Sequence, residues 1–347
     1  MRRRTAASIR CASPDLTNLL AREWMLDVPD TKIRTVPGSK FPESRLHIIQ
    51  DDLLHPILGG NKLRKLDALM PALATAGITD LVTCGGLQSA HTAAVAAVCA
   101  ERGITAHLLV RGERPAVPTG YHLLARMFGQ VTYVSRSEYA NRQAMFDKHI
   151  ARATDVAGPD SKVRALHEGA AEPLALLGLI RLVHYLSEPA ALGRGPCDLV
   201  TDCGTGVTAI GLALGVALLG LPWRIHGVML AGTKEYYQQQ QKDLTAASLS
   251  SFGAGNPSTE DASGGALPLN WRPRVNPRKF GAVLPGDVTT CRQVAQETGI
   301  LLDPIYSLAA WEVATGMAGA TQSRVAMLHN GGMMGLFGLA QRFPDQF

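Results

Sequence analysis

The chain contains 347 residues, of which 46% are hydrophobic and 18% are charged, and its formal net charge is +5. This composition excludes a disordered protein, and the length favours two domains with large cores. This net charge is small for the length, and several of the basic residues lie within the first ten positions. The sequence therefore has no basic stripe of the kind that binds nucleic acid. The longest apolar stretch, Ala209 to Trp223, is interrupted by glycines and a proline, so we expect no membrane-spanning segment.

The expected secondary structure alternates along the chain. Short β-like runs are predicted at 46–49, 81–84, 105–110, 131–134, 198–201, 225–230, 301–303 and 325–328. Helices are predicted from Leu63 to Leu73, at 90–101, 120–129, 138–153 and 174–186, after Gly206, at 287–298 and from Leu308. This order predicts an α/β protein with two doubly wound parallel-sheet domains.

The same order suggests where the domains divide. We expect a larger domain made of residues 16–66 and 185–347, and a smaller α/β domain at 67–184. Residues 245–275 are rich in Ser, Gly, Ala, Pro and Asn, and they predict an irregular insertion or mobile loop within the larger domain.

The first residues and the cysteines bear on the compartment. Residues 1–15 contain four arginines and no acidic residue before Asp15, which is typical of an organellar transit peptide, although a disordered basic tail explains the composition nearly as well. The six cysteines show no paired metal-ligand spacing, so we expect reduced thiols in an intracellular compartment and no metal site. The expected location is a mitochondrion or plastid in the first case and the cytoplasm otherwise.

One lysine stands out from the other cations. Lys62 lies in the segment Gly-Gly-Asn-Lys-Leu-Arg-Lys at 59–65, at the junction between a glycine loop and the expected helix. Two further cations, Arg64 and Lys65, follow within three residues, and their repulsion would favour loss of a proton from the Lys62 ammonium group. A lysine that forms a Schiff base needs this property. The alternative is that the three cations form a solvated basic helix start.

Glycine turns occur at four of the expected strand ends, and ligands gather at such ends in open parallel sheets. The four turns are at 59–60, 85–86, 204–206 and 331–332. The second is followed by Gln88, Ser89 and Thr92 at a helix start, which suits a carboxylate. The third offers backbone N–H groups and two hydroxyls at a helix start, which suits a phosphate. It lacks the lysine of a nucleotide P-loop and the spacing of a dinucleotide site, so neither ATP nor NAD is favoured.

Five segments together resemble one enzyme family. They lie at 48–70, 81–103, 199–215, 299–312 and 325–338. They are similar to the D-cysteine desulfhydrase and 1-aminocyclopropane-1-carboxylate deaminase family of pyridoxal-phosphate enzymes, which have fold type II, the tryptophan synthase β-like fold, and they suggest a divergent plant or algal branch. The resemblance covers about Arg45 to Phe343, with 245–275 unmatched, and its most specific motif is GGNKxRKL.

The resemblance implies a cofactor site in the larger domain. Lys62 would form the Schiff base with pyridoxal 5'-phosphate and later move the α-proton of the substrate. Asn61 would hold the phenolic oxygen of the cofactor and Lys65 would face its phosphate. Ser307 would lie near the pyridine nitrogen, where a neutral hydroxyl leaves that nitrogen unprotonated, which moderates the electron sink and favours elimination over transamination. The phosphate turn comprises Cys203, Gly204, Thr205, Gly206, Val207 and Thr208.

The resemblance also implies the catalytic and substrate-binding residues. The expected catalytic residues are Lys62, Ser89 and Tyr306. The expected substrate-binding residues are Gln88, Ser89, Ala90, His91 and Tyr306. Simpler roles exist for several of these side chains: Ser89 as a helix cap, Tyr306 as a core aromatic, Thr208 as an ordinary first-turn hydroxyl, and His91, His167 and His329 as structural histidines. Glu168 and Glu172 are interpreted as a helix N-terminal pair.

The sequence departs from the family pattern mainly on the substrate side. Ala90 replaces an asparagine, and 169–172 reads Gly-Ala-Ala-Glu where the family has Gly-Gly-Ser-Asn. Val207 replaces a glycine and Asn330 a threonine, and the lysine that follows the tyrosine motif is replaced, since the run reads Tyr306-Ser307-Leu308-Ala309. The expected reaction is β-elimination from D-cysteine, a small amino-acid substrate, to give pyruvate, ammonia and hydrogen sulfide. The alternatives are 1-aminocyclopropane-1-carboxylate deamination, or a cofactor-binding protein with lost or altered catalysis; the resemblance also implies a homodimer.

Overall fold

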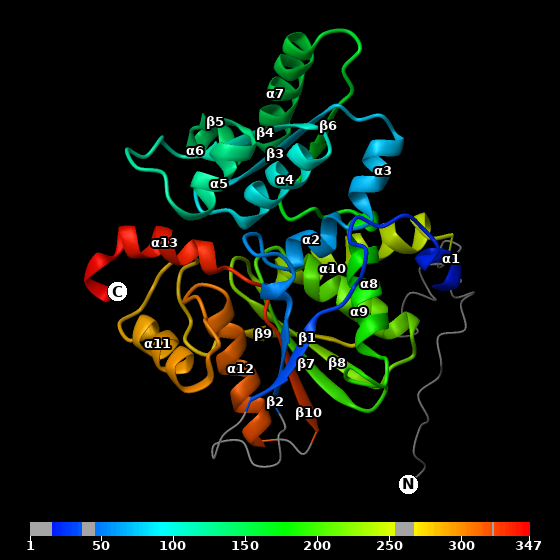
Figure 1. Cartoon of the computed structure of the whole chain (residues 1–347), viewed down its shortest axis with the longest axis vertical. Coiled ribbons are helices and arrows are strands. Elements are labelled where there is room, and N and C mark those ends of the chain that lie inside the picture. Colours follow the sequence, from blue (N-terminus) through cyan, green and yellow to red (C-terminus); the bar gives the residue numbers. More distant parts are fainter. Residues whose placement is uncertain (1–15, 37–45, 254–266, 321–322) are drawn as a thin grey trace.

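The computed structural model describes residues 16–36, 46–253, 267–320 and 323–347, which form two α/β units, one above the other in Figure 1. The larger unit contains a six-stranded sheet in the order β1-β2-β10-β7-β8-β9. These strands are β1 (Lys32–Thr35), β2 (Leu46–Gln50), β10 (Arg324–Leu328), β7 (Cys197–Cys203), β8 (Trp223–Met229) and β9 (Leu269–Pro273). All neighbours are parallel except β1 and β2.

The smaller unit contains a four-stranded, fully parallel sheet in the order β5-β4-β3-β6. Its strands are β5 (Gln130–Val134), β4 (Thr105–Arg111), β3 (Asp80–Gly86) and β6 (Val163–Leu166). Its helices are α3 (Leu69–Thr75), α4 (Ala90–Glu101), α5 (Gly120–Phe128), α6 (Arg136–Ala140) and α7 (Arg142–Ala157). The two parallel sheets confirm the predicted fold class.

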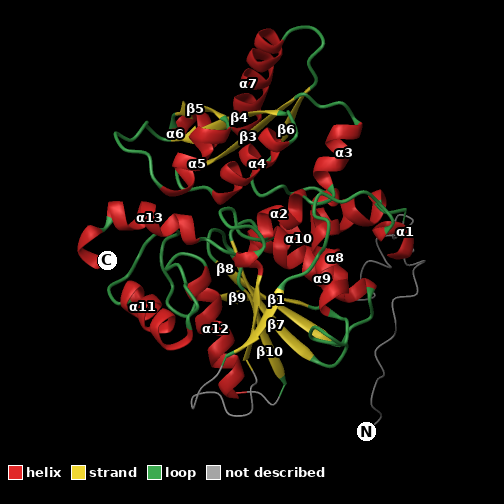
Figure 2. Ribbon diagram, viewed as in Figure 1, coloured by secondary structure: helices red, strands yellow, loops and turns green. Residues whose placement is uncertain are grey.

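Helices cover both faces of the larger sheet (Figure 2). The remaining elements are α1 (Leu16–Leu20), η2 (Asp51–Leu53), α2 (Asn61–Leu66), α8 (Pro173–Leu186), α9 (Val207–Leu218), α10 (Lys234–Ser251), α11 (Asp287–Thr298), α12 (Ser307–Ala320), α13 (Met333–Arg342) and η4 (Pro344–Gln346). The central strand β7 is buried at every position. Leu199 faces a core shared with α8 and α9, whereas Val200 faces a core shared with α11 and α12. The strand was predicted at 198–201, ahead of the glycine turn, and it is covered on both faces although three of its seven residues are polar.

The boundary expected at 184/185 does not match the packing of α8. Gly211 and Gly215 of α9 allow this helix to approach α8 closely, because a Cβ at Gly211 would lie 2.5 Å from Leu179. Gly178 of α8 lies even closer to α2, where a Cβ would be 1.8 Å from the Arg64 carbonyl oxygen. Helix α8 therefore packs with the larger unit.

The insertion expected at 245–275 is more regular than predicted, although 254–266 lies outside the described residues. Helix α10 continues to Ser251, since Leu244 and Ser248 are buried, and β9 adds a parallel strand beside β8. The indole N–H of Trp271 in β9 donates to Gln241 in α10 at 2.9 Å. A long-range contact thus orders a segment that lacks local periodicity.

Three other expectations were wrong in detail. Residues 301–303 form no strand, because Asp303 instead accepts hydrogen bonds from the backbone that follows it. The helix expected at 138–153 is divided into α6 and α7 at Asn141, whose side chain caps α7. The helix expected from Leu63 is divided into α2 and α3. No helix of the described chain is long and apolar enough to cross a membrane.

Candidate active site

The glycine turns of the larger unit meet beneath the smaller unit. The Gly60 N–H donates to the carbonyl of Asn330 at 3.3 Å, which joins the first turn to the fourth. The Asn61 amide donates to the Thr208 hydroxyl at 3.4 Å, which joins the first turn to the third. A Cβ at Gly204 would lie 3.7 Å from the Tyr306 ring. Segments that are distant in sequence therefore surround one lysine.

Lys62 is the centre of this arrangement. Its ammonium donates to the side-chain oxygen of Asn61 at 3.0 Å, and no carboxylate of the described chain forms an ion pair with it. Burial lowers the pKa of Lys62, while the more distant carboxylates of Asp202 and Glu168 act in the opposite direction. The lowered pKa favours a neutral amine, which is the nucleophilic form.

The cause of the lowered pKa differs from the expected one. Arg64 does not press on Lys62, because its guanidinium forms two hydrogen bonds with Asp51, at 2.8 and 3.1 Å. Both side chains of this pair are fully buried, and Arg64 also donates to the Pro29 carbonyl at 2.6 Å. Within the lysine motif, Arg64 is therefore a structural anchor for α2, and desolvation rather than nearby cations lowers the pKa of Lys62.

Lys65 is a second buried amine on the same helix. It is 4% exposed and donates to no side chain of the described residues. Burial, followed by the charge of Lys62, lowers its pKa well below the usual value. A buried cation without a counter-ion is costly. The interior beside α2 is thus prepared for a negatively charged group.

The phosphate turn is held from below by a residue that the sequence analysis missed. The Tyr237 hydroxyl lies 2.7 Å from the Cys203 carbonyl oxygen and 2.8 Å from that of Gly204, and it accepts from the N–H groups of Leu230 and Ala231. This hydroxyl therefore fixes the backbone on both sides of the strand end. Tyr237 lies more than thirty positions from the turn, so no local signal marks it.

Within the turn itself, Gly206 is required by its conformation. Its φ is +85°, and a Cβ would lie 2.9 Å from Tyr237 and 3.0 Å from Trp271. Val207 and Thr208 then begin α9 with backbone N–H groups that no earlier turn of helix can pair. Thr208 accepts from Asn61, so its own hydroxyl hydrogen is available to a ligand. Burial raises the pKa of the Cys203 thiol, which remains protonated.

The strand next to the lysine carries a further buried carboxylate. Asp202 lies immediately before the phosphate turn and accepts from the Asn330 amide at 2.9 Å. The same amide nitrogen donates to Thr201 at 2.9 Å, and burial raises the pKa of Asp202. The side-chain oxygen of Asn330 is buried without a partner in the described residues. Asn330, read from the sequence as a departure, thus connects the fourth turn to β7.

The turn of the smaller unit places Ser89 at the start of α4. Its side chain accepts from the Thr92 N–H at 3.3 Å, which is the capping arrangement, and its hydroxyl hydrogen is not donated within the described chain. Gln88 behaves differently from the expectation. Its amide donates to the Thr119 carbonyl at 3.0 Å and accepts from the Tyr121 N–H at 3.1 Å, so it fixes the start of α5. Ala90 is the first residue of α4 and adds no polar atom.

His91, which was expected to bind the substrate, is instead buried and hydrogen-bonded to a neighbouring strand. His91 is 5% exposed, and its Nε2 lies 3.0 Å from the Thr83 hydroxyl, which itself donates to the Leu166 carbonyl. The nitrogen therefore donates to Thr83. Burial, with smaller contributions from Lys62 and Lys65, lowers the pKa of His91 to about 3. A neutral, fixed imidazole connects β3 to α4.

Tyr306 and Ser307 follow a loop that Asp303 organises. Asp303 accepts from the N–H groups of Ile305, Tyr306 and Ser307 at 2.9 to 3.0 Å. The Ser307 hydroxyl donates to the same carboxylate at 2.8 Å and accepts from the Asp303 N–H at 2.7 Å. Burial raises the pKa of Tyr306, so its phenol is neutral and can donate a hydrogen bond. Ser307, with its hydrogen directed to Asp303, can only accept from a further ligand.

The segment at 169–172 carries strain and charge. Ala170 has a φ of 52°, the left-handed region that disfavours a side chain, at a position where the family pattern has glycine. Glu172 pairs with Arg164 at 2.5 Å and Glu168 with Arg142 at 3.3 Å. The two acids therefore face arginines rather than acting together as a helix N-terminal pair.

Two parallel-sheet units with a buried lysine at the start of a helix between them, facing a glycine turn, define the class of pyridoxal-phosphate enzymes of fold type II. A solved structure titled as that of an ACC deaminase homologue has the same fold, with a TM-score of 0.81, 22% identity, and coverage of 96% of this chain and 99% of the other.

The sequence comparisons identify the family. Residues 26–331 match the family described as "Pyridoxal-phosphate dependent enzyme", and the chain belongs to it. A rice protein (Oryza sativa subsp. japonica) named "Putative D-cysteine desulfhydrase 2, mitochondrial" is 42% identical over 96% of this chain and 95% of its own length. An Arabidopsis thaliana protein named "Bifunctional D-cysteine desulfhydrase/1-aminocyclopropane-1-carboxylate deaminase, mitochondrial" is 26% identical over 85% of this chain and 74% of its own length.

The residues present fit pyridoxal phosphate. The aldehyde of this cofactor requires an amine with a lowered pKa, which Lys62 supplies. Its phosphate requires unpaired N–H groups and positive charge, which the start of α9 and the unpaired Lys65 supply. The orphaned oxygen of Asn330 is a further polar atom in the same region that still lacks a partner.

Proposed function

We propose that the protein binds pyridoxal 5'-phosphate through Lys62 and catalyses β-elimination from D-cysteine, yielding pyruvate, ammonia and hydrogen sulfide. The observation that carries the proposal is the partly buried Lys62 amine of lowered pKa, which donates to Asn61, whose amide in turn donates to Thr208 of the phosphate turn. The family match and the names of the rice and Arabidopsis relatives support it. When bound, the cofactor supplies an electron sink for the α-carbon of an amino acid.

In this proposal, the residues of the larger unit hold the cofactor. Lys62 binds its aldehyde carbon, and Asn61 fixes the lysine and offers its amide beside it. The N–H groups from Gly204 to Thr208, with the hydroxyls of Thr205 and Thr208, bind the phosphate, and Lys65 balances its charge. The Cys203 carbonyl is held by Tyr237, so the turn keeps its shape when the ligand is absent.

The proton transfers belong to three side chains. Lys62, as a neutral amine, is the base that would take the α-proton of the substrate. Ser89 donates its free hydroxyl hydrogen in a hydrogen bond to the substrate carboxylate, or serves as a second proton-transfer group beside Lys62. Tyr306 remains protonated because burial raises its pKa, so it can donate to the leaving sulfur.

Ser307 has a different role from the one expected. Its hydrogen is directed to Asp303, so the hydroxyl presents a lone pair to a neighbouring group. A hydroxyl that accepts stabilises a protonated ring nitrogen, whereas the expected hydroxyl would leave that nitrogen unprotonated. The Asp303–Ser307 pair therefore strengthens the electron sink in this proposal.

The test compares the purified wild-type protein with Lys62→Ala. We expect the wild type to carry a visible absorbance band that borohydride bleaches, and to form pyruvate and sulfide from D-cysteine. L-cysteine and 1-aminocyclopropane-1-carboxylate are the comparison substrates. Absence of the band, or full activity in Lys62→Ala, contradicts cofactor attachment. Turnover of the cyclopropane substrate above that of D-cysteine assigns deamination instead.

We further propose a homodimer formed through α5 and α13. These helices lie side by side, since a Cβ at Gly120 of α5 would lie 2.3 Å from the carbonyl oxygen of Met334 in α13. Met127 is 72% exposed and Phe337 is 59% exposed on them. Exposed apolar side chains on adjoining helices suit a protein contact. Light scattering should give the mass of two chains for the wild type and of one chain for Met127→Asp/Phe337→Asp.

We also propose delivery to mitochondria. The basic composition of residues 1–15 supports it, as does the word mitochondrial in the names of both plant relatives. A fluorescent protein fused after Asp15 should enter mitochondria, and changing the four arginines to glutamine should leave it in the cytosol. Plastid or cytosolic fluorescence from the unchanged fusion contradicts this proposal.

A further inference from the structure

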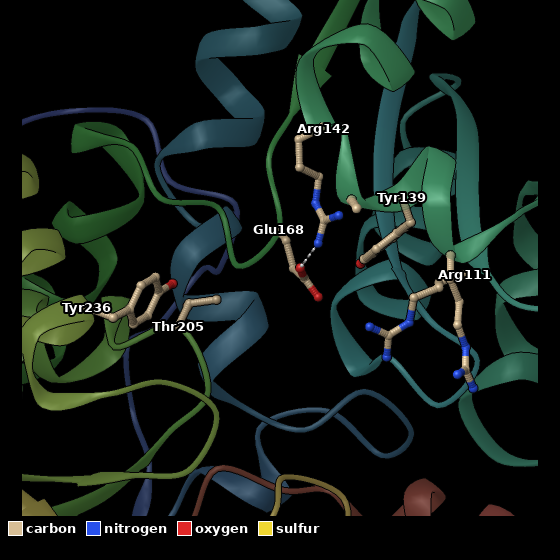
Figure 3. Close-up of a pocket in the computed structure, with 8 residues that line it drawn as sticks. Arg111, Tyr139, Arg142, Glu168, Thr205 and Tyr236 are labelled. Atoms are coloured by element: carbon tan, nitrogen blue, oxygen red, sulfur yellow. Dashed lines mark hydrogen bonds and ion pairs between the residues drawn. The ribbon is translucent and has the colours of Figure 1, made fainter.

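A cavity of about 610 Å³ lies between the two units, beside the phosphate turn (Figure 3). Arg111 of β4, Arg136 of α6 and Arg142 of α7 line it from the smaller unit, and Thr205 and Tyr236 line it from the larger unit. Lys62, Asn61 and Thr208 do not line it. The cavity therefore adjoins the lysine site without being lined by the lysine: Thr205 is shared with the phosphate turn, and the Glu168 carboxylate acts on the pKa of Lys62.

The charges around this cavity are unbalanced. Its lining contains three guanidinium groups and a single carboxylate, that of Glu168. Glu168 pairs with Arg142 at 3.3 Å, and both side chains are about two-fifths exposed. Arg111 and Arg136 form no ion pair with an acidic residue of the described chain. A dianion would balance the lining, whereas a zwitterionic amino acid would not.

The arginines are partly pre-oriented for such a ligand. The guanidinium carbon of Arg142 lies 3.5 Å from the ring centroid of Tyr139, and that of Arg111 lies 5.2 Å from the same ring. Tyr139 is 4% exposed, so the ring is a fixed platform. Guanidinium groups held by cation–π contacts keep their N–H donors free for the two oxygens of a phosphate or carboxylate.

The opposite wall suits an organic group. Tyr236 is 44% exposed and packs edge-on against Tyr237, with ring centroids 5.2 Å apart. Thr205 is fixed because its side chain packs on Gly169, where a Cβ would lie 2.5 Å from its hydroxyl. The cavity thus has cations on one side and an aromatic ring with a hydroxyl on the other. This combination fits a ring that carries a phosphate.

We propose that this cavity is a second anion site that binds a small phosphate monoester with a flat organic group. The phosphate lies among Arg111, Arg136 and Arg142, and the organic group lies against Tyr236. The ligand and the Glu168 carboxylate are both anionic, so they compete for Arg142. The Arg142–Glu168 ion pair is half-exposed and therefore weak enough to be displaced. The proposal does not depend on which reaction occurs at Lys62.

The test measures binding of phenyl phosphate and of inorganic phosphate by calorimetry on the full chain loaded with pyridoxal phosphate and then freed of unbound cofactor, which is itself a phosphate monoester with a flat ring. We expect phenyl phosphate to bind to the wild type and Arg111→Ala/Arg136→Ala to weaken it at least tenfold. The matched control is Arg114→Ala/Arg126→Ala, which removes two exposed cations of the same unit outside the cavity and should leave the affinity within twofold. Tyr236→Ala should weaken phenyl phosphate and leave inorganic phosphate unchanged.

Two results overturn the proposal. One is equal loss of affinity in the cavity variant and the charge-matched control, which indicates general attraction to a basic surface. The other is binding of inorganic phosphate without phenyl phosphate. Thr208→Val separates this site from the cofactor site, because Thr208 belongs to the phosphate turn and does not line the cavity. Thr208→Val should weaken cofactor binding and leave phenyl phosphate binding intact. A failure of the proposed cofactor function can therefore be told apart from a failure of the second anion site.

Discussion

The two sides of the candidate active site are built differently. On the larger unit, buried hydrogen bonds hold the site: Tyr237 fixes the phosphate turn, Asn61 joins Lys62 to Thr208, and Asp51 anchors the helix that carries the lysine. On the smaller unit, Glu168 and its partner Arg142 are both about two-fifths exposed. The cofactor side is therefore rigid, whereas the substrate side can change with little effect on folding.

This difference accounts for two of the changes from the family pattern but not for those at Val207 and Asn330, which are buried in the larger unit. Ala90 and Glu172 lie in the smaller unit or its connection, where a new side chain meets solvent or an arginine. Substitutions in the buried network of the larger unit would leave polar groups without partners, which costs about 1–3 kcal/mol each. The comparison predicts large effects on activity or stability for substitutions at Lys62, Asp51 and Tyr237, and a small effect on stability at Ala170.

Removal of the lysine amine should have the largest effect. Lys62→Ala leaves no amine at the start of α2, so the borohydride-sensitive absorbance should disappear and turnover should fall by about 10²–10⁴-fold or more. The fold should persist, which circular dichroism checks. Lys65→Ala is the matched control, and it should weaken the affinity for the cofactor while keeping covalent attachment. A Lys62→Ala protein that still gives the absorbance band contradicts the assignment.

Breaking the buried ion pair should destabilise the larger unit strongly. Asp51→Ala leaves the fully buried Arg64 guanidinium without its partner, and the expected loss in the free energy of unfolding is about 3–5 kcal/mol. Urea denaturation measures it. Asp51→Leu/Arg64→Met removes both charges and should lose less. An equal loss in the single and double variants contradicts an uncompensated charge as the cause.

Removal of the Tyr237 hydroxyl tests the support of the phosphate turn. Tyr237→Phe leaves two N–H groups and two carbonyls without their shared partner, so we expect a loss of about 1–3 kcal/mol in the free energy of unfolding and weaker cofactor binding. Tyr236→Phe, on the adjacent exposed ring, is the control and should change neither quantity. Unchanged cofactor affinity in Tyr237→Phe means that the turn keeps its shape without this hydroxyl.

Relief of the backbone strain at Ala170 should have a small, opposite effect. Its φ of 52° suits glycine, so Ala170→Gly should raise the free energy of unfolding by about 0.5–1 kcal/mol. Gly169→Ala should do the reverse and should also disturb Thr205, which a Cβ would contact. Thermal unfolding measures both. A destabilised Ala170→Gly protein contradicts strain at this position.

The pH dependence of stability should distinguish the buried lysines from surface lysines. Burial lowers the pKa of Lys62 and Lys65, while the unfolded chain titrates near 10.5. Between the lowered pKa and 10.5 the unfolded state binds more protons than the folded state, so the stability of the cofactor-free protein should rise with pH. Lys62→Met/Lys65→Met should reduce that slope. An unchanged slope means that both amines stay protonated in the folded protein.

Much of the fold could be predicted because local patterns specify it. The bounds of α4 and α11 agree with the predicted 90–101 and 287–298, since an alanine-rich run and an amphipathic run each end at a polar or glycine position. β1, β6 and β9 were not predicted, because edge strands of only four or five residues are too short to show a periodic pattern. The division of 138–153 at Asn141 depends on one capping side chain within a helical pattern.

The sequence by itself was enough to predict the fold class, the family and the candidate Schiff-base lysine. Strand and helix patterns are local, and Lys62 lies in a compact motif formed by residues adjacent in the chain. Only the tertiary structure decided why its amine has a lowered pKa, which residues support the phosphate turn and where the unbalanced arginines gather. Tyr237, Asp303 and Arg142 act through contacts with segments far away or through side-chain geometry that periodicity cannot show. Burial and charge balance are properties of packed space, so they appear only once the two sheets are assembled.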